Sequence, residues 1–116
     1  MVEIQFYRTA DGKCPVERFL DALQSKQAAK VYWTLRAVKS LNPVPIQYMQ
    51  KLTNTDDLWE VRVIFSSDIF RLLGFFSREG RLVLCHGFAK KTQKTPLQEI
   101  ATAEARKTDY EKRHHE

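Results

Sequence analysis

Cysteine is scarce in this chain of 116 residues, which has only Cys14 and Cys85, far apart in the sequence. Two lone cysteines form no Cys-x-x-Cys pair and cannot supply the disulfide framework of a small secreted protein. No spacing of histidine or cysteine resembles a zinc site, and no acidic cluster suits magnesium. We therefore expect reduced thiols, a cytoplasmic location, and neither a metal ion nor any other cofactor.

Long apolar runs, glycine and proline are also few. No stretch of about 18 apolar residues occurs, and residues 1–9 alternate polar with apolar instead of forming a signal peptide. We expect no membrane span and no membrane partner. With four glycines, four prolines and 43% hydrophobic residues, the composition is typical of one packed domain covering residues 1–116.

Positive charge is in excess, with 19 Lys and Arg residues against 14 Asp and Glu residues. The formal net charge of +5 and the pI near 9.4 favour a polyanionic partner such as nucleic acid.

The first half of the chain carries one strand pattern and two helix patterns. Residues 2–7 alternate apolar with polar side chains, which predicts a half-buried strand. Pro15 suits a first helical position, and apolar residues recur at helical spacing through residues 15–23 and again to about Leu41. The two helices are expected to form a hairpin that ends at Pro43.

The second half predicts three strands, at residues 58–65, 68–76 and 81–88. Their connections are so short that we expect an antiparallel meander. An irregular link is expected before the first of these strands.

A last helix is expected to begin with Thr95 as its N-cap and Pro96 at its first position, with Gln98 completing a capping box. The sequence turns polar beyond Glu104, so residues 106–116 are expected to fray. The predicted fold class is α+β, in the order β-α-α-β-β-β-α. A helical hairpin would cover one face of an antiparallel sheet and leave the other face for function.

The first meander strand separates core residues from charged ones. Trp59, Val61 and Val63 point one way and should face the helices, so Glu60 and Arg62 point the other way. Trp59 and Trp33 are assigned to packing rather than to stacking on bases.

The next strand brings a second arginine to the same face. A two-residue turn at 66–67 places Arg62 opposite Arg71. Like charges facing each other across a sheet are destabilising, so an anion that bridges them explains the pair better. Phosphate is the natural candidate. The alternative is a pair of ordinary surface arginines that bind nearby carboxylates.

The last hairpin brings a histidine to this face. With residues 79–80 as the turn, His86 stands opposite Leu73, and Cys85 points to the core as an inert thiol. Glu60, Arg62, Arg71 and His86 then converge. His86 suits acid or base chemistry, although a lone strand histidine is often only a hydrogen-bonded filler.

A basic segment follows at the rim of the sheet. Lys90, Lys91 and Lys94 can contact a nucleic-acid backbone, and Phe88 can stack on a base. The alternative is an ordinary solvated loop.

Three stretches of this sequence resemble a known family. Residues 58–62 (LWEVR), 70–73 (FRLL) and 86–96 (HGFAKKTQKTP) are similar to the phage-derived, HigB-like branch of the RelE/ParE superfamily of type II toxins. The resemblance covers roughly residues 2–105. It implies a RelE-like fold, an endoribonuclease that cuts mRNA, usually at the ribosome, and a co-encoded antitoxin, a small helix-turn-helix protein.

The resemblance also implies roles for single residues. Arg62 and Arg71 match two strand arginines that hold and stabilise the scissile phosphate, and Glu60 matches a carboxylate that acts as base in some relatives. His86 and Phe88 stand where many relatives have a tyrosine or a His-Tyr pair, so the general acid stays open. The ribose 2′-hydroxyl would attack the phosphate, with Glu60 or a neutral lysine as base and His86 as acid.

Two alternatives have the same fold. One is a non-enzymatic ParE-type toxin that binds a protein such as gyrase, and the other is a degenerate domain that only binds nucleic acid or its antitoxin. A nuclease needs Glu60 and His86 within hydrogen-bond reach of one phosphate-sized pocket between Arg62 and Arg71. A binding protein has no such need.

Overall fold

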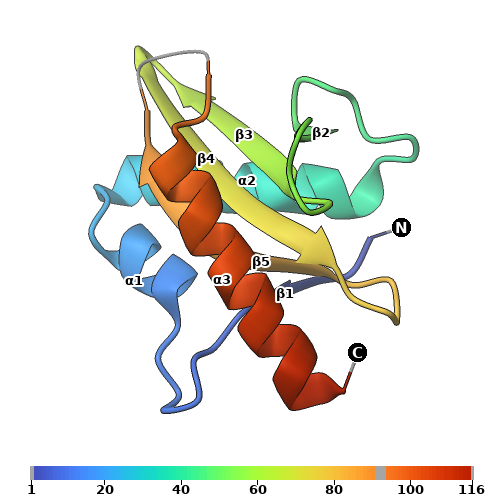
Figure 1. Cartoon of the computed structure of the whole chain (residues 1–116). Helices are drawn as coiled ribbons and strands as arrows, with labels where there is room; N and C mark the ends of the chain where they lie inside the picture. Colours follow the sequence, from blue (N-terminus) through green and yellow to red (C-terminus); the bar gives the residue numbers. More distant parts are fainter. Residues whose placement is uncertain (1, 91–93, 116) are drawn as a thin grey trace.

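The computed structural model describes residues 2–90 and 94–115, which form a five-stranded sheet between two helical layers. Helices α1 and α2 cover one face, and α3 runs diagonally across the other (Figure 1). The elements are β1 (Ile4–Phe6), α1 (Pro15–Asp21), α2 (Ser25–Ser40), β2 (Met49–Lys51), β3 (Trp59–Phe65), β4 (Asp68–Phe76), β5 (Leu82–Ala89) and α3 (Leu97–His114).

The mixed α+β class and the three-stranded meander are confirmed, but the predicted order and the purely antiparallel sheet are wrong. The strand order is β1-β5-β4-β3-β2, and β1 pairs with β5 in parallel. The alternation of residues 2–7 predicts a strand without specifying its direction. The short strand β2 lies in the expected irregular link, and its three residues are too few to show a period of two.

The hairpin between β3 and β4 has the predicted two-residue turn and places Arg62 opposite Arg71. The hairpin between β4 and β5 differs from the prediction, because three residues, 78–80, form its turn. That turn puts Gly74 opposite Leu84, and a bulge then restores the predicted pairing of Leu73 with His86. The predicted pairing is therefore confirmed, although the reason for it was wrong.

The bulge also changes the position of Cys85. Its thiol is buried as predicted, but it lies in the core beneath α3 and not in the core beneath the helical hairpin. Gly74 is needed beside the bulge, because a Cβ there would lie 2.3 Å from the carbonyl oxygen of Val83.

Two apolar cores lie on the two faces of the sheet. The core on the side of α1 and α2 includes the predicted Val61 and Val63, with Trp59 packed at its margin. The second core lies on the side of α3, so it covers most of the sheet face that we expected to be open. Its buried members are Tyr7, Leu58, Leu73, Phe75, Val83, Cys85, Phe88, Ala103 and Tyr110.

Helix α3 continues to His114, so the expected fraying of residues 106–116 is wrong for the part described. Lys107 and Tyr110 are buried, and the Tyr110 ring packs edge-on against Phe75 at 5.3 Å. The helix begins at Leu97 with Pro96 at the N-cap and no side-chain cap, which corrects the role expected of Thr95.

Trp33 also departs from its predicted packing role, since 45% of its surface is exposed. In the part of the chain that the structure describes, no helix is long and apolar enough to cross a membrane.

Candidate functional site

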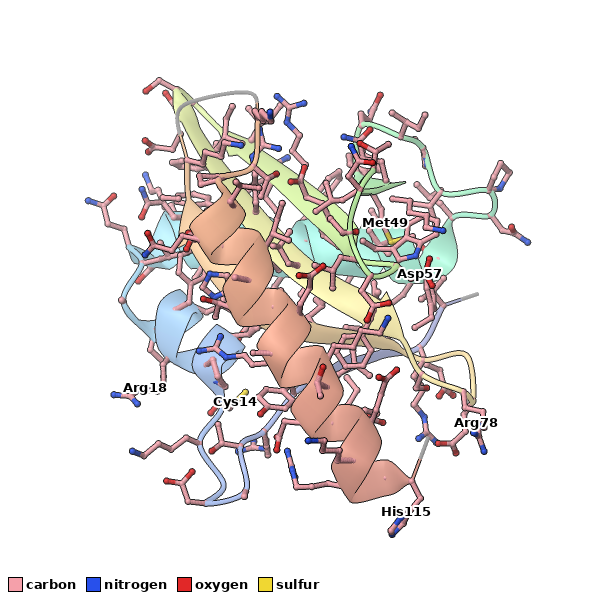
Figure 2. The ribbon with its side chains drawn as sticks, in the orientation of Figure 1. Cys14, Arg18, Met49, Asp57, Arg78 and His115 are labelled. Carbon is pink, nitrogen blue, oxygen red and sulfur yellow. The ribbon has the colours of Figure 1, made fainter. Side chains whose placement is uncertain are left out.

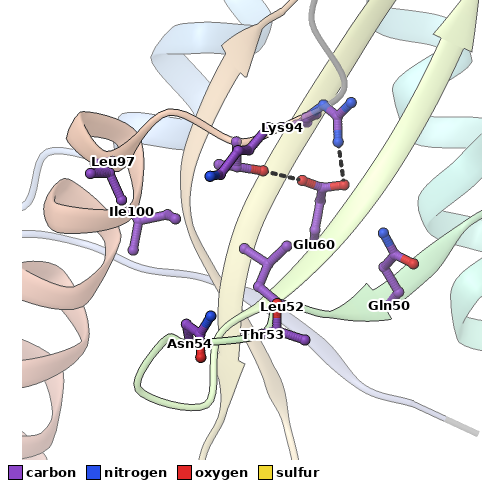
Figure 3. Close-up of a pocket in the computed structure, with 10 residues that line it drawn as sticks. Gln50, Leu52, Thr53, Asn54, Glu60, Lys94, Leu97 and Ile100 are labelled. Atoms are coloured by element: carbon purple, nitrogen blue, oxygen red, sulfur yellow. Dashed lines mark hydrogen bonds and ion pairs between the residues drawn. The ribbon is translucent and has the colours of Figure 1, made fainter.

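The centre of the site is a buried carboxylate held on both oxygens. Strands β3 and β4 place Glu60 and Arg71 on the side facing α3, with exposures of 0% and 3%. Arg71 Nη1 lies 2.6 Å from Glu60 Oε1, and Thr95 donates a hydrogen bond of 3.0 Å to Oε2 (Figure 3). This ion pair has additional hydrogen-bond support, which a buried pair needs to offset its desolvation.

A pocket of about 310 Å³ opens beside this network. Its volume is at the lower end of the range for small-molecule sites and provides room for a nucleotide-sized group. The wall from α3 is apolar. The other walls come from β2, β3, β4 and the segments after β2 and before α3, and they are polar except at Leu52 (Figure 3). The lining residues are Gln50, Leu52, Thr53, Asn54, Glu60, Arg71, Lys94, Thr95, Leu97 and Ile100.

Lys90 is the least satisfied cation near this network. Only 7% of its surface is exposed, and its buried amine has no hydrogen-bond partner among the described residues. Burial lowers the pKa of Lys90, and the positive charges of Arg71 and Arg62 lower it further, against an opposing effect from Glu60. The neutral form of this amine is therefore more accessible than in an ordinary lysine.

Arg62 does not line the same pocket as Arg71. It borders a second hollow together with Lys30 and Tyr48, and its buried Nε has no hydrogen-bond partner in the described residues. The two arginines are thus neighbours in the register, but they do not line a single phosphate-sized pocket.

His86 belongs to a separate network on α3. Its Nε2 lies 3.2 Å from Glu99 Oε1, and its Nδ1 lies 3.2 Å from Arg106 Nη1. Since a guanidinium only donates, Nδ1 must accept, which places the proton of a neutral ring on Nε2, toward Glu99. The ring stacks on Phe88, which is 8% exposed and so offers little surface for a base.

The structure therefore brings together part of the predicted site. Glu60, Arg71 and Lys94 border one pocket, whereas Arg62, His86, Phe88 and Lys90 are not among the residues that line it, and Lys91 lies outside the described residues. No group of three possible metal ligands occurs within residues 2–90 and 94–115.

Sequence reasoning missed three partners of the site. Thr95 was considered only as a helix cap, and Arg106 falls in the segment expected to fray. Glu99 carried no signal, because its contact with His86 depends on how α3 docks on the sheet.

The comparisons with known proteins gave one family match. A family model described as "Phage derived protein Gp49-like (DUF891)" matches residues 18–108, which include β3, β4, β5 and part of α3. No curated protein matches the chain.

Proposed function

The chain belongs to the phage-derived Gp49-like family (DUF891), a family of toxin-like proteins, and from that premise we propose that it is a type II toxin. In this proposal the chain has a RelE-like fold and cleaves messenger RNA on the ribosome without a metal ion. A co-encoded antitoxin neutralises it.

One observation carries the nuclease proposal: the buried, unpartnered amine of Lys90 beside the ion pair of Arg71 and Glu60. A buried ammonium without a hydrogen-bond acceptor costs stability, so such a group is usually retained for a functional reason. Lys90 does not itself line the pocket, so the phosphodiester would have to reach from the pocket to this amine, where it would supply the missing acceptor and a negative charge.

The geometry supports a division of roles that differs from the sequence-based one. Both oxygens of Glu60 are occupied, so this carboxylate serves to hold the Arg71 guanidinium toward the pocket. The lowered pKa of Lys90 suits a base that takes the proton of the ribose 2′-hydroxyl. Because His86 is held by α3, it positions that helix and takes no part in proton transfer.

The proposed reaction is a transesterification within the RNA. The 2′-oxygen forms a bond to phosphorus while the bond from phosphorus to the 5′-oxygen breaks. The 5′-oxygen leaves with a proton from water, the hydroxide so formed takes the proton held by Lys90, and a 2′,3′-cyclic phosphate remains. Arg71 stabilises the charge that develops on the phosphoryl oxygens, and Lys91 and Lys94 hold flanking phosphates.

A second candidate function has an observation in its favour. Because His86 and Glu60 are both engaged by other protein groups, the pocket lacks a ready acid-base pair. That arrangement favours a ParE-type toxin, which binds a protein such as gyrase and cleaves nothing.

The test is to induce the protein in cells and to map the 5′ ends of transcripts, alongside cleavage of ribosome-bound mRNA by purified protein that has first been treated with EDTA and dialysed. We expect the wild type to arrest growth and to cut RNA. Lys90→Met should abolish cutting without loss of thermal stability, because this amine has no partner to lose. Arg18→Ala is the matched control, since Arg18 projects into solvent from α1 (Figure 2).

Growth arrest with every transcript intact, combined with inhibition of DNA supercoiling by gyrase, would replace the nuclease proposal by the ParE-type one. A Lys90→Met variant that cuts at the wild-type rate would remove Lys90 from the mechanism.

A further inference from the structure

The outer side of α2 exposes aromatic and aliphatic side chains together. Trp33 on α2 is 45% exposed, and Ile64 near the C-terminal end of β3 is 52% exposed. Trp33 packs edge-on against Tyr48 at 6.1 Å, so the aromatic surface extends from α2 onto the segment before β2. Single exposed apolar residues are common on any protein, but a connected group of them marks an interaction surface.

Two adjoining hollows shape this surface, and Tyr48 lines both. The first, of about 370 Å³, is lined by Trp33, Arg36, Ala37, Ser40, Leu41 and Tyr48. The second, of about 330 Å³, is lined by Lys30, Thr34, Gln47, Tyr48, Arg62 and Ile64. We call these two sets of residues together the α2 surface.

The charge of this region has one sign. Residues 22–55 contain no aspartate or glutamate. Their charged residues are all basic: Lys26, Lys30, Arg36, Lys39 and Lys51. Within the described residues, none of the ion pairs includes Lys30, Arg36 or Arg62. The Lys30 amine instead lies 4.2 Å from the centre of the Trp33 ring.

We propose that the α2 surface binds an acidic segment of a partner protein. The apolar side chains of the segment would fill the two hollows, and its carboxylates would pair with Lys30, Arg36 and Arg62. Trp and Arg are enriched among the few interface residues that contribute most of the binding energy in protein complexes. This interaction does not depend on whether the chain cleaves RNA.

The apolar part of the α2 surface favours a protein over a nucleic acid. Leu41 and Ile64 offer contacts that a phosphate backbone cannot use, whereas an amphipathic segment carries matching aliphatic side chains.

The experiment selects short random peptides displayed on phage against the purified wild-type chain, and then titrates the enriched peptides in solution. We expect the enriched sequences to be acidic and to carry apolar residues at helical or alternating spacing. Their affinity should fall about tenfold or more in Trp33→Ala, and it should also fall in Arg36→Glu, with the charge effect shrinking as salt rises. Trp33→Phe should keep most of the affinity, and Arg18→Glu, a matched charge reversal on α1, should change nothing.

Three outcomes would overturn the proposal. The first is no enrichment, or enriched peptides that ignore Trp33→Ala and Arg36→Glu. The second is a single-stranded RNA probe whose binding is lost in Trp33→Ala, which would make the surface a nucleic-acid site. The third is a dimer in sedimentation that Trp33→Ala dissociates, which would make a second copy of this chain the occupant.

Discussion

Glu60 and Arg71 depend on each other in a place that water scarcely reaches. Each is almost completely buried, and their closest atoms are 2.6 Å apart. A buried pair adds little net stability over apolar residues of similar size, but removal of one partner leaves the other charge uncompensated. The ion pair therefore fixes the position of a guanidinium at the pocket more than it stabilises the fold.

This dependence gives a prediction about stability. Arg71→Met should lower the free energy of unfolding by about 3 to 5 kcal/mol, because it strands the Glu60 carboxylate. The double variant Glu60→Leu with Arg71→Met should recover much of that loss. Urea unfolding of the two single variants and the double variant measures the coupling, and additive effects would show that the pair is not coupled.

Cys85 gives a second prediction at this scale. Burial raises the pKa of its thiol to about 12, so the reactive thiolate is rare at pH 8. In a Cys14→Ala variant, a thiol-specific disulfide reagent should leave native protein unlabelled and should label it fully in urea. Rapid labelling of the native protein would mean that Cys85 is exposed in solution, contrary to its burial in the core beneath α3.

At the scale of elements, the meander shows how far alternation can predict a site. The period of two placed Glu60 and Arg71 on one face correctly, because the turn at residues 66–67 has an even length. The prediction for His86 combined a turn one residue too short with an unforeseen bulge, and the two errors cancelled. Turn lengths and bulges depend on local backbone geometry that alternation does not encode.

Helix α3 was predicted incompletely because a charged residue occupies a core position. Ile100, Ala103, Lys107 and Tyr110 follow helical spacing and face the sheet, but the lysine hides the pattern. Its amine donates a hydrogen bond of 2.6 Å to the carbonyl oxygen of Asp56, which makes its burial tolerable. The contacts of His86 with α3 could not be predicted either, because the sequence pattern does not reveal which face of α3 packs on the sheet.

The docking of α3 can be tested at Tyr110. Tyr110→Ala should lower the free energy of unfolding by about 3 to 5 kcal/mol, as large-to-small changes of buried aromatic residues do. Lys112→Ala, an exposed change on the same helix, should stay within about 0.5 kcal/mol. Equal stability of the two variants in urea would indicate that the end of α3 is frayed after all.

At the scale of the whole molecule, the two helical layers separate the two basic regions. The pocket beside Glu60 has a wall from α3, and the first hollow of the α2 surface is lined mainly by α2. These two helices lie on opposite faces of the sheet (Figure 1). Arg62 is the exception, because it lines the α2 surface while its charge also lowers the pKa of Lys90. Under the two proposals above, the net charge of +5 would serve two anionic partners that need not compete.

Because the two regions are separate, an acidic peptide and RNA should bind independently. Arg36→Glu should abolish binding of the acidic peptide while RNA binding stays within about twofold, since Arg36 lies only on the α2 surface. Lys94→Met should weaken RNA binding and leave the peptide affinity within about twofold, and Arg62→Ala should weaken both. Fluorescence anisotropy with labelled peptide and labelled single-stranded RNA, each titrated in the presence of the other, measures the two affinities.

Salt distinguishes direct phosphate contact from a general effect of charge. Each phosphate contact on a single strand contributes about −0.7 to the slope of log K against log salt, so Lys94→Met, which removes a cation assigned to a flanking phosphate, should reduce the RNA slope by about that amount. Arg36→Glu should leave the RNA slope unchanged. If peptide and RNA instead displace each other, or if Arg36→Glu reduces the RNA slope as much as Lys94→Met does, then one continuous basic surface binds both ligands and the two sites are not separate.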